Sequence, residues 1–252
     1  MKLYDFPQSP NCRKVRMYLA EKGLSVPLQP MNLLAGEQRS PEFLQRNPFG
    51  AVPILELDNG TVIPESLVII EYLEEQYPEP PLLGTEPVGR ALVRAWERRC
   101  ELGVALQATR RFLHSSPFFA SRVVQNPQVV EEAAQVLRER LTLLDTQLRD
   151  HEWVAGAFSL ADITLFTGVD FAAGSGFTLD PAWRHVSRWY AAMRARPSAA
   201  AWMILQVEED RHGIHYAWTH RLAGQHCWPG MWRPQSLGAS DWQERAGIGC
   251  CC

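Results

Sequence analysis

The segment that spans residues 47–66, NPFGAVPILELDNGTVIPES, limits the possible folds of this chain more than any other segment. It contains an apolar run, an Asn59-Gly60 turn, a second short apolar run and a serine where a helix can begin. This pattern predicts a β-hairpin that leads into a helix. Pro53 stands at the head of the first strand, where it cannot donate a sheet hydrogen bond. We therefore expect an edge position and a bend that suits a cis Val52-Pro53 bond.

Both ends of this segment offer groups to a ligand. Beside a cis Pro53, the backbone amide and carbonyl of Val52 would face solvent and pair with an extended peptide, as a neighbouring strand does. Glu65 and Ser66 stand at the start of the next helix, where free backbone amides favour a carboxylate. The alternative interpretation is that Pro53 only ends a loop and Ser66 only caps a helix.

The N-terminal third of the chain predicts a small mixed sheet covered by helices, because a βαβ unit precedes the hairpin and its helix. The expected elements are, in order, a strand at 2–6, a helix at 10–22, a strand at 26–28, a short helix at 41–46, the hairpin, and a helix at 66–77.

The first of these helices has clear end signals: Ser9 as N-cap, Pro10 at the first helical position and Gly23 after the last turn. Cys12 shares one face with Val15 and Leu19, so we expect it to face the core, with the basic residues Arg13, Lys14 and Arg16 elsewhere. An N-cap side chain lies outside its helix, next to free amides and the positive end of the dipole. The Ser9 hydroxyl could therefore donate to an anion such as a thiolate.

Residues 78–87 (PEPPLLGTEP) are too rich in proline for a helix or a central strand, so they predict a linker. After the linker the hydrophobic periodicity is helical almost to residue 211. The expected organisation is an α/β domain at 1–77, a linker at 78–87, an all-helical domain at 88–211 and an irregular extension at 212–252.

Two features of the helical part concern its core. Leu92, Trp96, Cys100 and Gly103 form one expected core stripe, and residues 159–174 are apolar nearly all round, as in a central buried helix. Ser159 and Asp162 have the spacing of a capping box. A lone acid in an apolar helix can be catalytic, but capping satisfies Asp162 without any substrate, and we favour the structural role.

Composition excludes several classes of function. The net charge of -3 and the pI near 6.2 provide no basic surface for nucleic acid or for an anionic membrane. No apolar segment has the length of a bilayer, and the N-terminus lacks the apolar core of a secretory signal, so we expect a cytoplasmic protein with no stable membrane insertion.

The six cysteines form no disulfide framework, and we expect reduced thiols. His212, His215, His220, His226 and Cys227 follow no familiar zinc pattern, so we predict no metal site. The tryptophans of the tail (Trp218, Trp228, Trp232 and Trp242) are expected to anchor it on the helical domain, while the cluster Cys250, Cys251 and Cys252 has no structural rationale.

With these motifs in view, the chain resembles the glutathione transferase superfamily over roughly residues 1 to 205. SPNCRKV (9–15) resembles the active-site turn of the serine-type cytosolic classes, and NPFGAVP (47–53) resembles their cis-proline loop. PES (64–66) resembles the site for the γ-glutamyl end of glutathione, and FSLADIT (158–164) resembles the N-capping motif of the helical domain.

The resemblance implies a thioredoxin-like domain of βαβαββα order joined to an all-α helical bundle. It also implies a homodimer, a detoxification role and glutathione as cosubstrate for attack on a hydrophobic electrophile. In this interpretation Ser9 activates the thiol. The glutathione-binding residues would be Val52 and Pro53 for the cysteinyl backbone, Glu65 and Ser66 for the amino and carboxylate groups, and Gln38 and Arg39 for the glycyl end.

The same resemblance places the second-substrate pocket on the first helices of the helical domain. Aromatic walls suit apolar electrophiles, whereas the alternative for each of these side chains is ordinary loop and core packing. The candidates are Arg110, Arg111, Phe112, Phe118 and Phe119.

Three alternatives stay open. A thiol reductase would act through Cys12, but cysteine occupies only the last position of the Ser9–Cys12 turn, and the first position is the exposed nucleophile in thioredoxin-like proteins. Tyr4, at the end of the first strand, is a second candidate for thiol activation. A non-catalytic binding protein with the same fold is the third. One departure from the family pattern is Ala51, where many relatives carry a polar residue that contacts glutathione, so one hydrogen bond to glutathione would be missing and its affinity lower.

Overall fold

The computed structural model describes residues 1–201, 203–210 and 213–220, with side chains for residues 1–201. Its N-terminal part contains a four-stranded sheet in the order β2-β1-β3-β4. β1 is parallel to β2 and antiparallel to β3, which pairs with β4 as the predicted hairpin. The strands are β1 (Lys2–Asp5), β2 (Leu28–Pro30), β3 (Ile54–Glu56) and β4 (Val62–Pro64).

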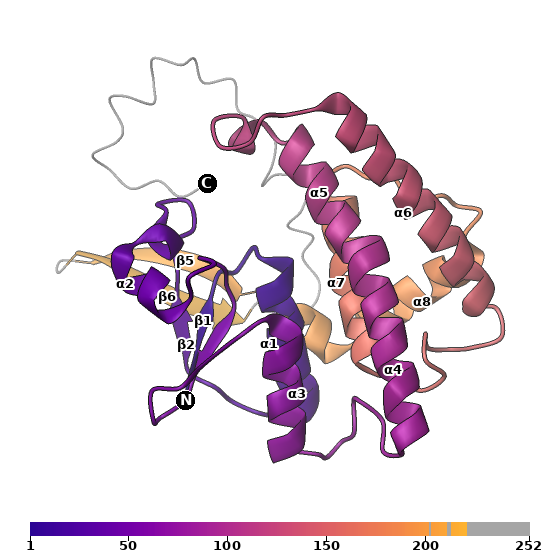
Figure 1. The fold of residues 1–252 in the computed structure, drawn as a ribbon, viewed down its shortest axis with the longest axis horizontal. Helices are drawn as coiled ribbons and strands as arrows, with labels where there is room; N and C mark the ends of the chain where they lie inside the picture. Colours follow the sequence, from indigo (N-terminus) through magenta and orange to yellow (C-terminus); the bar gives the residue numbers. More distant parts are fainter. Residues whose placement is uncertain (202, 211–212, 221–252) are drawn as a thin grey trace. The chain divides into compact units, whose positions relative to one another are not determined.

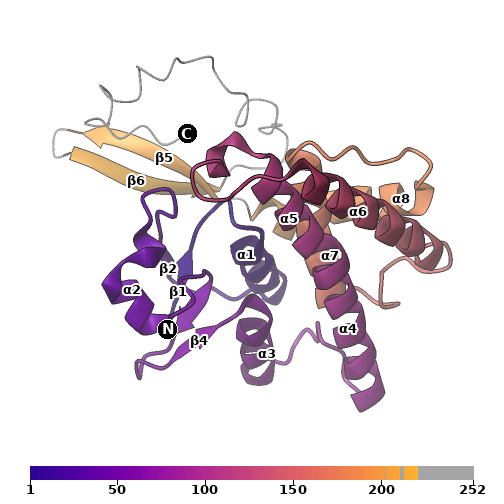
Figure 2. The same cartoon turned by 45° about the horizontal axis from the view of Figure 1, so that its top comes forward.

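Helices cover both faces of this sheet. Figures 1 and 2 show α1 (Pro10–Lys22) and α3 (Ser66–Gln76) side by side on one face and α2 (Pro41–Arg46) on the other. A short 3-10 helix, η1 (Glu37–Arg39), precedes α2. The element order confirms the predicted βαβαββα arrangement.

The ends of α1 form as the sequence predicts. The Ser9 hydroxyl accepts a hydrogen bond from the Cys12 amide at 3.3 Å, Pro10 is the first helical residue, and Gly23 takes the left-handed conformation with φ of 65°. A positive φ is strained for residues with a side chain, so the glycine ends the helix here.

The basic residues of α1 differ from the expectation that they fall away from the core. Arg13, Lys14 and Arg16 are all buried, because α1 packs against α3 and the apolar side chains of the sheet, and also against a helix of the second part. Each cation has an acidic partner, since a buried charge without one is costly. The pairs are Arg13 with Asp170, Lys14 with Glu97 and Glu101, and Arg16 with Asp5.

The second part is helical. A π-helical turn, η2 (Glu101–Ala105), joins the first two helices, and 3-10 turns η3 (Pro117–Phe119) and η4 (Pro197–Ala200) follow. The α-helices are α4 (Pro87–Cys100), α5 (Leu106–Ser115), α6 (Pro127–Gln147), α7 (Leu160–Gly174) and α8 (Arg184–Ala195).

The core stripe that begins in α4 agrees with the prediction only in part, because Cys100 is buried as expected and Trp96 only partly. Leu92 is 56% exposed, and the buried positions are Val93, Glu97 and Cys100 of α4, followed by Val104 of η2 and Ala108 of α5. Apolar residues occur on both adjoining faces of this helix, so periodicity alone does not separate them.

The predicted central helix, α7, is buried along most of its length. A Cβ at Gly168 would lie 2.9 Å from the Ala105 Cα, so glycine permits the close approach of α7 and η2. The Asp162 carboxylate accepts hydrogen bonds from the Ser159 amide, the Val154 amide and the Trp189 indole, which supports the structural role for this acid.

The chain after α8 differs from the predicted helix that continues almost to residue 211. β5 (Met203–Asp210) and β6 (Gly213–His220) pair as an antiparallel hairpin. Ile, Val, Tyr and Trp in these segments favour strands. Most of the proposed tail features lie outside the described residues: His212, His226, Cys227, the last three tryptophans and the terminal cysteines.

The proline-rich stretch between α3 and α4 is held to the first part. The Lys22 ammonium donates to the carbonyls of Tyr77, Pro78 and Pro80 at 2.6–3.1 Å. Within the described part of the chain, the helices are too short or too polar to cross a membrane.

Candidate functional site

The N-terminus of α1 presents a hydroxyl with an available proton. The Ser9 amide donates to the Phe6 carbonyl at 3.0 Å, and the Ser9 oxygen accepts from the Cys12 amide at 3.3 Å. Because the hydroxyl oxygen acts as acceptor in the cap, its O–H remains available for donation to an anion. The half-buried side chain also lies at the positive end of the α1 dipole.

Cys12 has the opposite environment. Its thiol is fully buried, in a small cluster with Tyr4, Met31, Val52 and their neighbours. Burial, followed by the nearby Asp5 charge, raises the pKa of Cys12 to about 12, although the Phe6 amide donates to Sγ at 3.4 Å. Cys12 is therefore a neutral thiol at physiological pH.

The Tyr4 hydroxyl is already engaged. It donates to the Glu56 carboxylate at 2.8 Å, and its ring packs edge-on against Phe43 with centroids 5.9 Å apart. These contacts direct Tyr4 toward α2 and β3, which leaves Ser9 as the better placed hydroxyl.

The loop before β3 has the predicted cis Val52-Pro53 bond. The Asn47 amide group, buried below this loop, donates to the Ala51 carbonyl at 2.8 Å and holds the loop from inside. The β1–β3 register begins at Ile54, so the Val52 backbone lies beyond the paired strands and can meet an extended ligand.

The start of α3 lies beside this loop. Ile54 of β3 is opposite Pro64 of β4, which brings Glu65 and Ser66 next to the cis proline. Glu65 is exposed and has φ of 68°, the only positive φ of a non-glycine residue in the described part of the chain. Such backbone strain is concentrated at functional positions. Ser66 is buried as the first residue of α3.

The segment η1 packs directly on the cis-proline loop. Gly50 has φ of 60°, and a Cβ there would lie 2.8 Å from the Gln38 carbonyl oxygen and 2.9 Å from Arg39 Nη1. Arg39 also donates to the Phe49 carbonyl at 3.4 Å. Among the described residues, the Gln38 Oε1 atom is buried without a hydrogen-bond partner, so an incoming donor would satisfy it.

The two candidate pocket arginines have protein partners. Arg110 pairs with Glu132 of α6 at 3.6 Å. Arg111 donates to the carbonyls of Ser175 and Gly176 at 2.9 and 3.1 Å, where it caps the C-terminus of α7.

The candidate phenylalanines form one connected group. Phe112 makes edge-to-face contacts with Phe119 and with Phe171 of α7, at centroid distances of 5.5 and 5.0 Å. Phe118 contacts Phe119 at 4.9 Å and is 37% exposed. The exposed edge of this group is the part that a ligand can reach.

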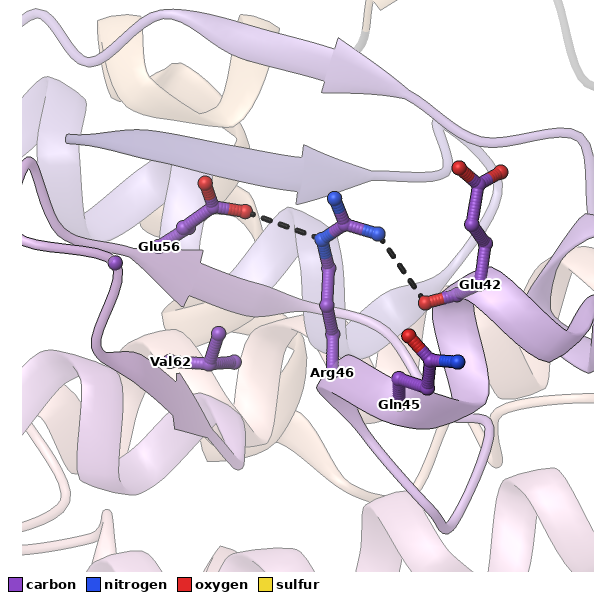
Figure 3. Close-up of a pocket in the computed structure, with 6 residues that line it drawn as sticks. Glu42, Gln45, Arg46, Glu56 and Val62 are labelled. Atoms are coloured by element: carbon purple, nitrogen blue, oxygen red, sulfur yellow. Dashed lines mark hydrogen bonds and ion pairs between the residues drawn. The ribbon is translucent and has the colours of Figure 1, made fainter.

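A separate polar hollow of about 350 Å³ lies between α2 and the β3–β4 hairpin (Figure 3). Arg46 crosses it and contacts the Glu56 carboxylate at 3.4 Å and the Glu42 carbonyl at 3.2 Å. Gly60 of the hairpin turn also lines it, at the opposite end of β3 from Pro53. The hollow therefore does not include Ser9 or the cis-proline loop.

Sequence reasoning missed a buried acid that pairs with α1, the helix that begins after Ser9. Glu97 of α4 is completely buried and accepts from Lys14 at 3.4 Å and from Thr164 at 3.3 Å. Burial raises its pKa to about 7 despite the Lys14 charge. The sequence contains one signal for it, since Glu97 lies four residues after Val93 and thus on the same helix face. That signal is visible only when Val93, and not Leu92, is taken as the core position.

Comparison with known proteins agrees with these features. Residues 3–81 match the family model of the glutathione S-transferase N-terminal domain, and residues 104–197 match that of the C-terminal domain. The chain is 35% identical to glutathione S-transferase 2 of Saccharomyces cerevisiae over 207 residues, which cover 79% of this chain and 87% of the yeast protein. It is 33% identical to maleylacetoacetate isomerase of Pseudomonas aeruginosa over 208 residues, covering 79% and 93% of the two chains.

Solved structures show the same fold. The crystal structure of Gtt2 from Saccharomyces cerevisiae has a TM-score of 0.75 and 35% identity, covering 79% of this chain and 98% of that one. A glutathione S-transferase-I bound with lactoylglutathione has a TM-score of 0.68 and 27% identity, covering 78% and 95%. This chain therefore belongs to the glutathione S-transferase family and is an enzyme that uses glutathione as its cosubstrate.

Proposed function

We propose that the Ser9 hydroxyl stabilises the thiolate of bound glutathione, which then attacks an electrophilic carbon of a hydrophobic second substrate. The observation that carries this proposal is the Ser9 cap: its oxygen accepts from the Cys12 amide, so its proton is available to the thiolate. The reacting sulfur forms a bond to carbon, and the leaving group departs with the electrons of the broken bond.

Glutathione would lie extended along the cis-proline loop. The Val52 amide and carbonyl would pair with the cysteinyl backbone, while Glu65 and Ser66 would bind the amino and carboxylate groups of the γ-glutamyl end. Gln38 and Arg39 would bind the glycyl end, where the buried Gln38 Oε1 accepts from the peptide amide. In this proposal the bend at the cis Val52-Pro53 bond turns the Val52 backbone groups toward glutathione.

The required change in thiol acidity is modest. A free thiol has a pKa of about 8.5, and each unit by which the site lowers that value favours the anion by about 1.4 kcal/mol. One hydroxyl donor and a helix N-terminus together lower a thiol pKa by about one to several units. A fall of about two units or more makes most of the bound glutathione nucleophilic at neutral pH.

The second substrate would contact the exposed edge of the phenylalanine group Phe112, Phe118 and Phe119. Edge-to-face packing holds these rings in place, and 37% of the Phe118 surface stays exposed for contact with a substrate. Aromatic surfaces favour apolar electrophiles. Arg110 and Arg111 would line only the margin of this pocket. Their guanidinium groups already bind Glu132 and the Ser175 carbonyl, respectively.

Isomerisation is a second candidate reaction. The similarity to a maleylacetoacetate isomerase supports it, and the same thiolate would serve if it added to a conjugated carbon and was later expelled. Isomerisation consumes no glutathione, so measuring free thiol during turnover of maleylacetoacetate separates it from conjugation.

We also propose a cytoplasmic homodimer with a role in detoxification. Val68 of α3 and Val88 and Leu92 of α4 are 46%, 71% and 56% exposed, and burial of such apolar side chains favours association. Light scattering of the purified protein tests this point, with a monomeric mass as the contrary result.

The decisive experiment compares Ser9→Ala with Ser9→Thr. In Ser9→Ala we expect the thiol pKa of bound glutathione, followed by ultraviolet absorbance of the thiolate, to rise by about one unit or more. The value of kcat/KM with a model electrophile should fall about 10- to 100-fold, because a tenfold loss corresponds to about 1.4 kcal/mol. Ser9→Thr retains a hydroxyl and should recover part of the activity.

Cys12→Ala is the matched control, since it removes a neutral buried thiol. If Ser9→Ala leaves the thiol pKa unchanged while Cys12→Ala abolishes turnover, the thiol reductase replaces this proposal. A protein whose melting temperature glutathione raises, but which turns over no electrophile, would be the non-catalytic binding protein.

A further inference from the structure

One exposed arginine connects the helical part to the glutathione-binding part. Arg122 follows η3, and its Nη2 atom donates to the Leu34 carbonyl at 2.9 Å. Its guanidinium carbon lies 5.3 Å from the Phe118 ring centroid, a stacking distance for a cation over an aromatic face. Leu34 belongs to the loop at residues 31–36, between β2 and η1.

Hydrogen bonds within this loop hold it to the start of η1. The Asn32 side-chain oxygen accepts from the backbone amides of Leu34 and Ala35 at 3.0 Å. The backbone amide of Asn32 donates to the Glu37 carboxylate at 2.6 Å. Gly36 takes the left-handed conformation with φ of 80° and leads directly into η1. The position of Leu34 therefore influences the position of the residues that follow it.

The loop also adjoins the thiol site. Leu33 packs on the small cluster of Tyr4, Cys12, Met31, Phe43, Val52 and Ile54, which lies beneath Ser9 and the cis-proline loop. Gln38 and Arg39 of η1 contact Gly50 of that loop. A contact made at Leu34 can thus reach both ends of the glutathione site.

On the helical side, the same aromatic group sets the position of Arg122. The Arg122 amide donates to the Phe119 carbonyl at 2.9 Å, and Phe119 contacts both Phe112 and Phe118. A ligand that packs on the exposed Phe118 edge would therefore meet the ring on which the guanidinium stacks.

We propose that Arg122 is a positioning residue that fastens the loop at residues 31–36, and with it η1, over bound glutathione. Because the Arg122 guanidinium stacks on Phe118, a second substrate that changes this stacking would change glutathione affinity, and linkage makes that effect reciprocal. This inference rests on the proposed roles of Gln38 and Arg39. Unlike the buried ion pairs of α1, the Arg122–Leu34 contact is exposed, so it can open for entry and release.

The test measures glutathione binding to the full-length protein by calorimetry, without an electrophile. Arg122→Ala should raise the Kd for glutathione about three- to tenfold, the effect of losing one hydrogen bond. The KM for glutathione should rise in parallel, while the melting temperature of the ligand-free protein and the thiol pKa of bound glutathione stay unchanged. Arg122→Lys keeps one donor but loses planar stacking, so an intermediate Kd is expected.

Two controls make the result specific. Arg138→Ala removes an exposed arginine that pairs with Glu131 on α6, far along the chain from the loop, and should leave the Kd unchanged. Arg39→Ala tests the glycyl-end assignment itself. If Arg39→Ala weakens binding and Arg122→Ala does not, the inference is wrong while the site proposal stands. If neither weakens binding, the assignment of the glycyl end is wrong and the inference falls with it.

Discussion

Ser9 and Cys12 lie one helical turn apart, yet their surroundings give them opposite chemistry. The Ser9 side chain is half-buried at the positive end of α1, and its hydroxyl hydrogen is available for donation because the oxygen acts as the acceptor in the cap. The Cys12 side chain points into an apolar cluster, where burial raises its pKa to about 12. A turn with serine first and cysteine last therefore favours stabilisation of a bound thiolate over thiol exchange.

We predict that Cys12 resists thiol reagents in the folded protein. With a pKa of about 12, only about one Cys12 side chain in ten thousand is ionised at pH 8. Mass spectrometry of peptides after alkylation should show unmodified Cys12 in the native protein and modified Cys12 in denaturant. A Ser9→Cys variant provides the matched control: its new thiol lies at a helix N-terminus and should react rapidly. Rapid alkylation of native Cys12 would contradict the prediction.

Residues whose role depends on local sequence were predictable, and those that depend on distant partners were not. The Ser9 cap and the cis bond before Pro53 follow from a few neighbouring residues. The burial of Arg13 does not, because its partner Asp170 is 157 residues away. From α1 alone, three basic side chains indicate a largely solvated face. Their burial depends on acids of β1, α4, η2 and α7, which only the tertiary structure brings to them.

At the scale of elements, α4 and the π-helical turn η2 place two acids around one buried cation. Glu97 and Glu101 contact the Lys14 ammonium at 3.4 and 3.5 Å, and Thr164 of α7 donates to Glu97. Burial raises the pKa of Glu97 to about 7. For Glu101, burial alone would raise the pKa, but the Lys14 and Arg98 charges together with the hydrogen bonds to Glu97 and Lys14 lower it. Periodicity predicted α4 but not this network, since the predicted stripe included Trp96 in place of the buried Glu97.

This arrangement predicts a pH dependence of stability. Between the ordinary pKa of 4.5 and the folded value of about 7, the folded chain binds a proton on Glu97 that the unfolded chain has released. Stability therefore rises as the pH falls from 8 to 5, by on the order of 2 kcal/mol. The lowered pKa of Glu101 acts only below its ordinary value of 4.5, outside this window.

Urea unfolding of the wild type and of Glu97→Gln at several pH values measures the effect. The amide removes the titrating group at nearly constant shape, so the difference in unfolding free energy between variant and wild type should shrink as the pH falls toward 5. A difference that is the same at pH 5 and pH 8 would show that Glu97 does not titrate in this range.

At the scale of the molecule, α1 and the turn after α8 connect the sheet to the helices. Arg13 pairs with Asp170 of α7 at 2.5 Å and donates to the Ala199 carbonyl at 3.2 Å. Arg196 forms a two-fold pair with Glu21 at 2.7 Å. The sequence predicted two structural parts and a linker, but these contacts, which join residues 157 or more apart, were beyond local patterns.

We predict that the thioredoxin-like and helical parts unfold together, because the Arg13–Asp170 pair and its neighbours are buried between them. Trp96, Trp153, Trp183 and Trp189 lie in the helical part, and the other five tryptophans follow it in the sequence. In a variant with those five replaced by phenylalanine, tryptophan fluorescence reports on the helical part, while alkylation of Cys12 reports on the first part. Both probes should give the same urea midpoint.

Asp170→Asn leaves the buried Arg13 without its carboxylate and should lower the unfolding free energy by about 3 kcal/mol or more, shifting both midpoints equally. Glu131→Gln, at an exposed pair, should shift neither. If Cys12 becomes reactive at lower urea than the tryptophans respond, α1 separates from α7 while the helical part is still folded, and the two parts are not one cooperative unit.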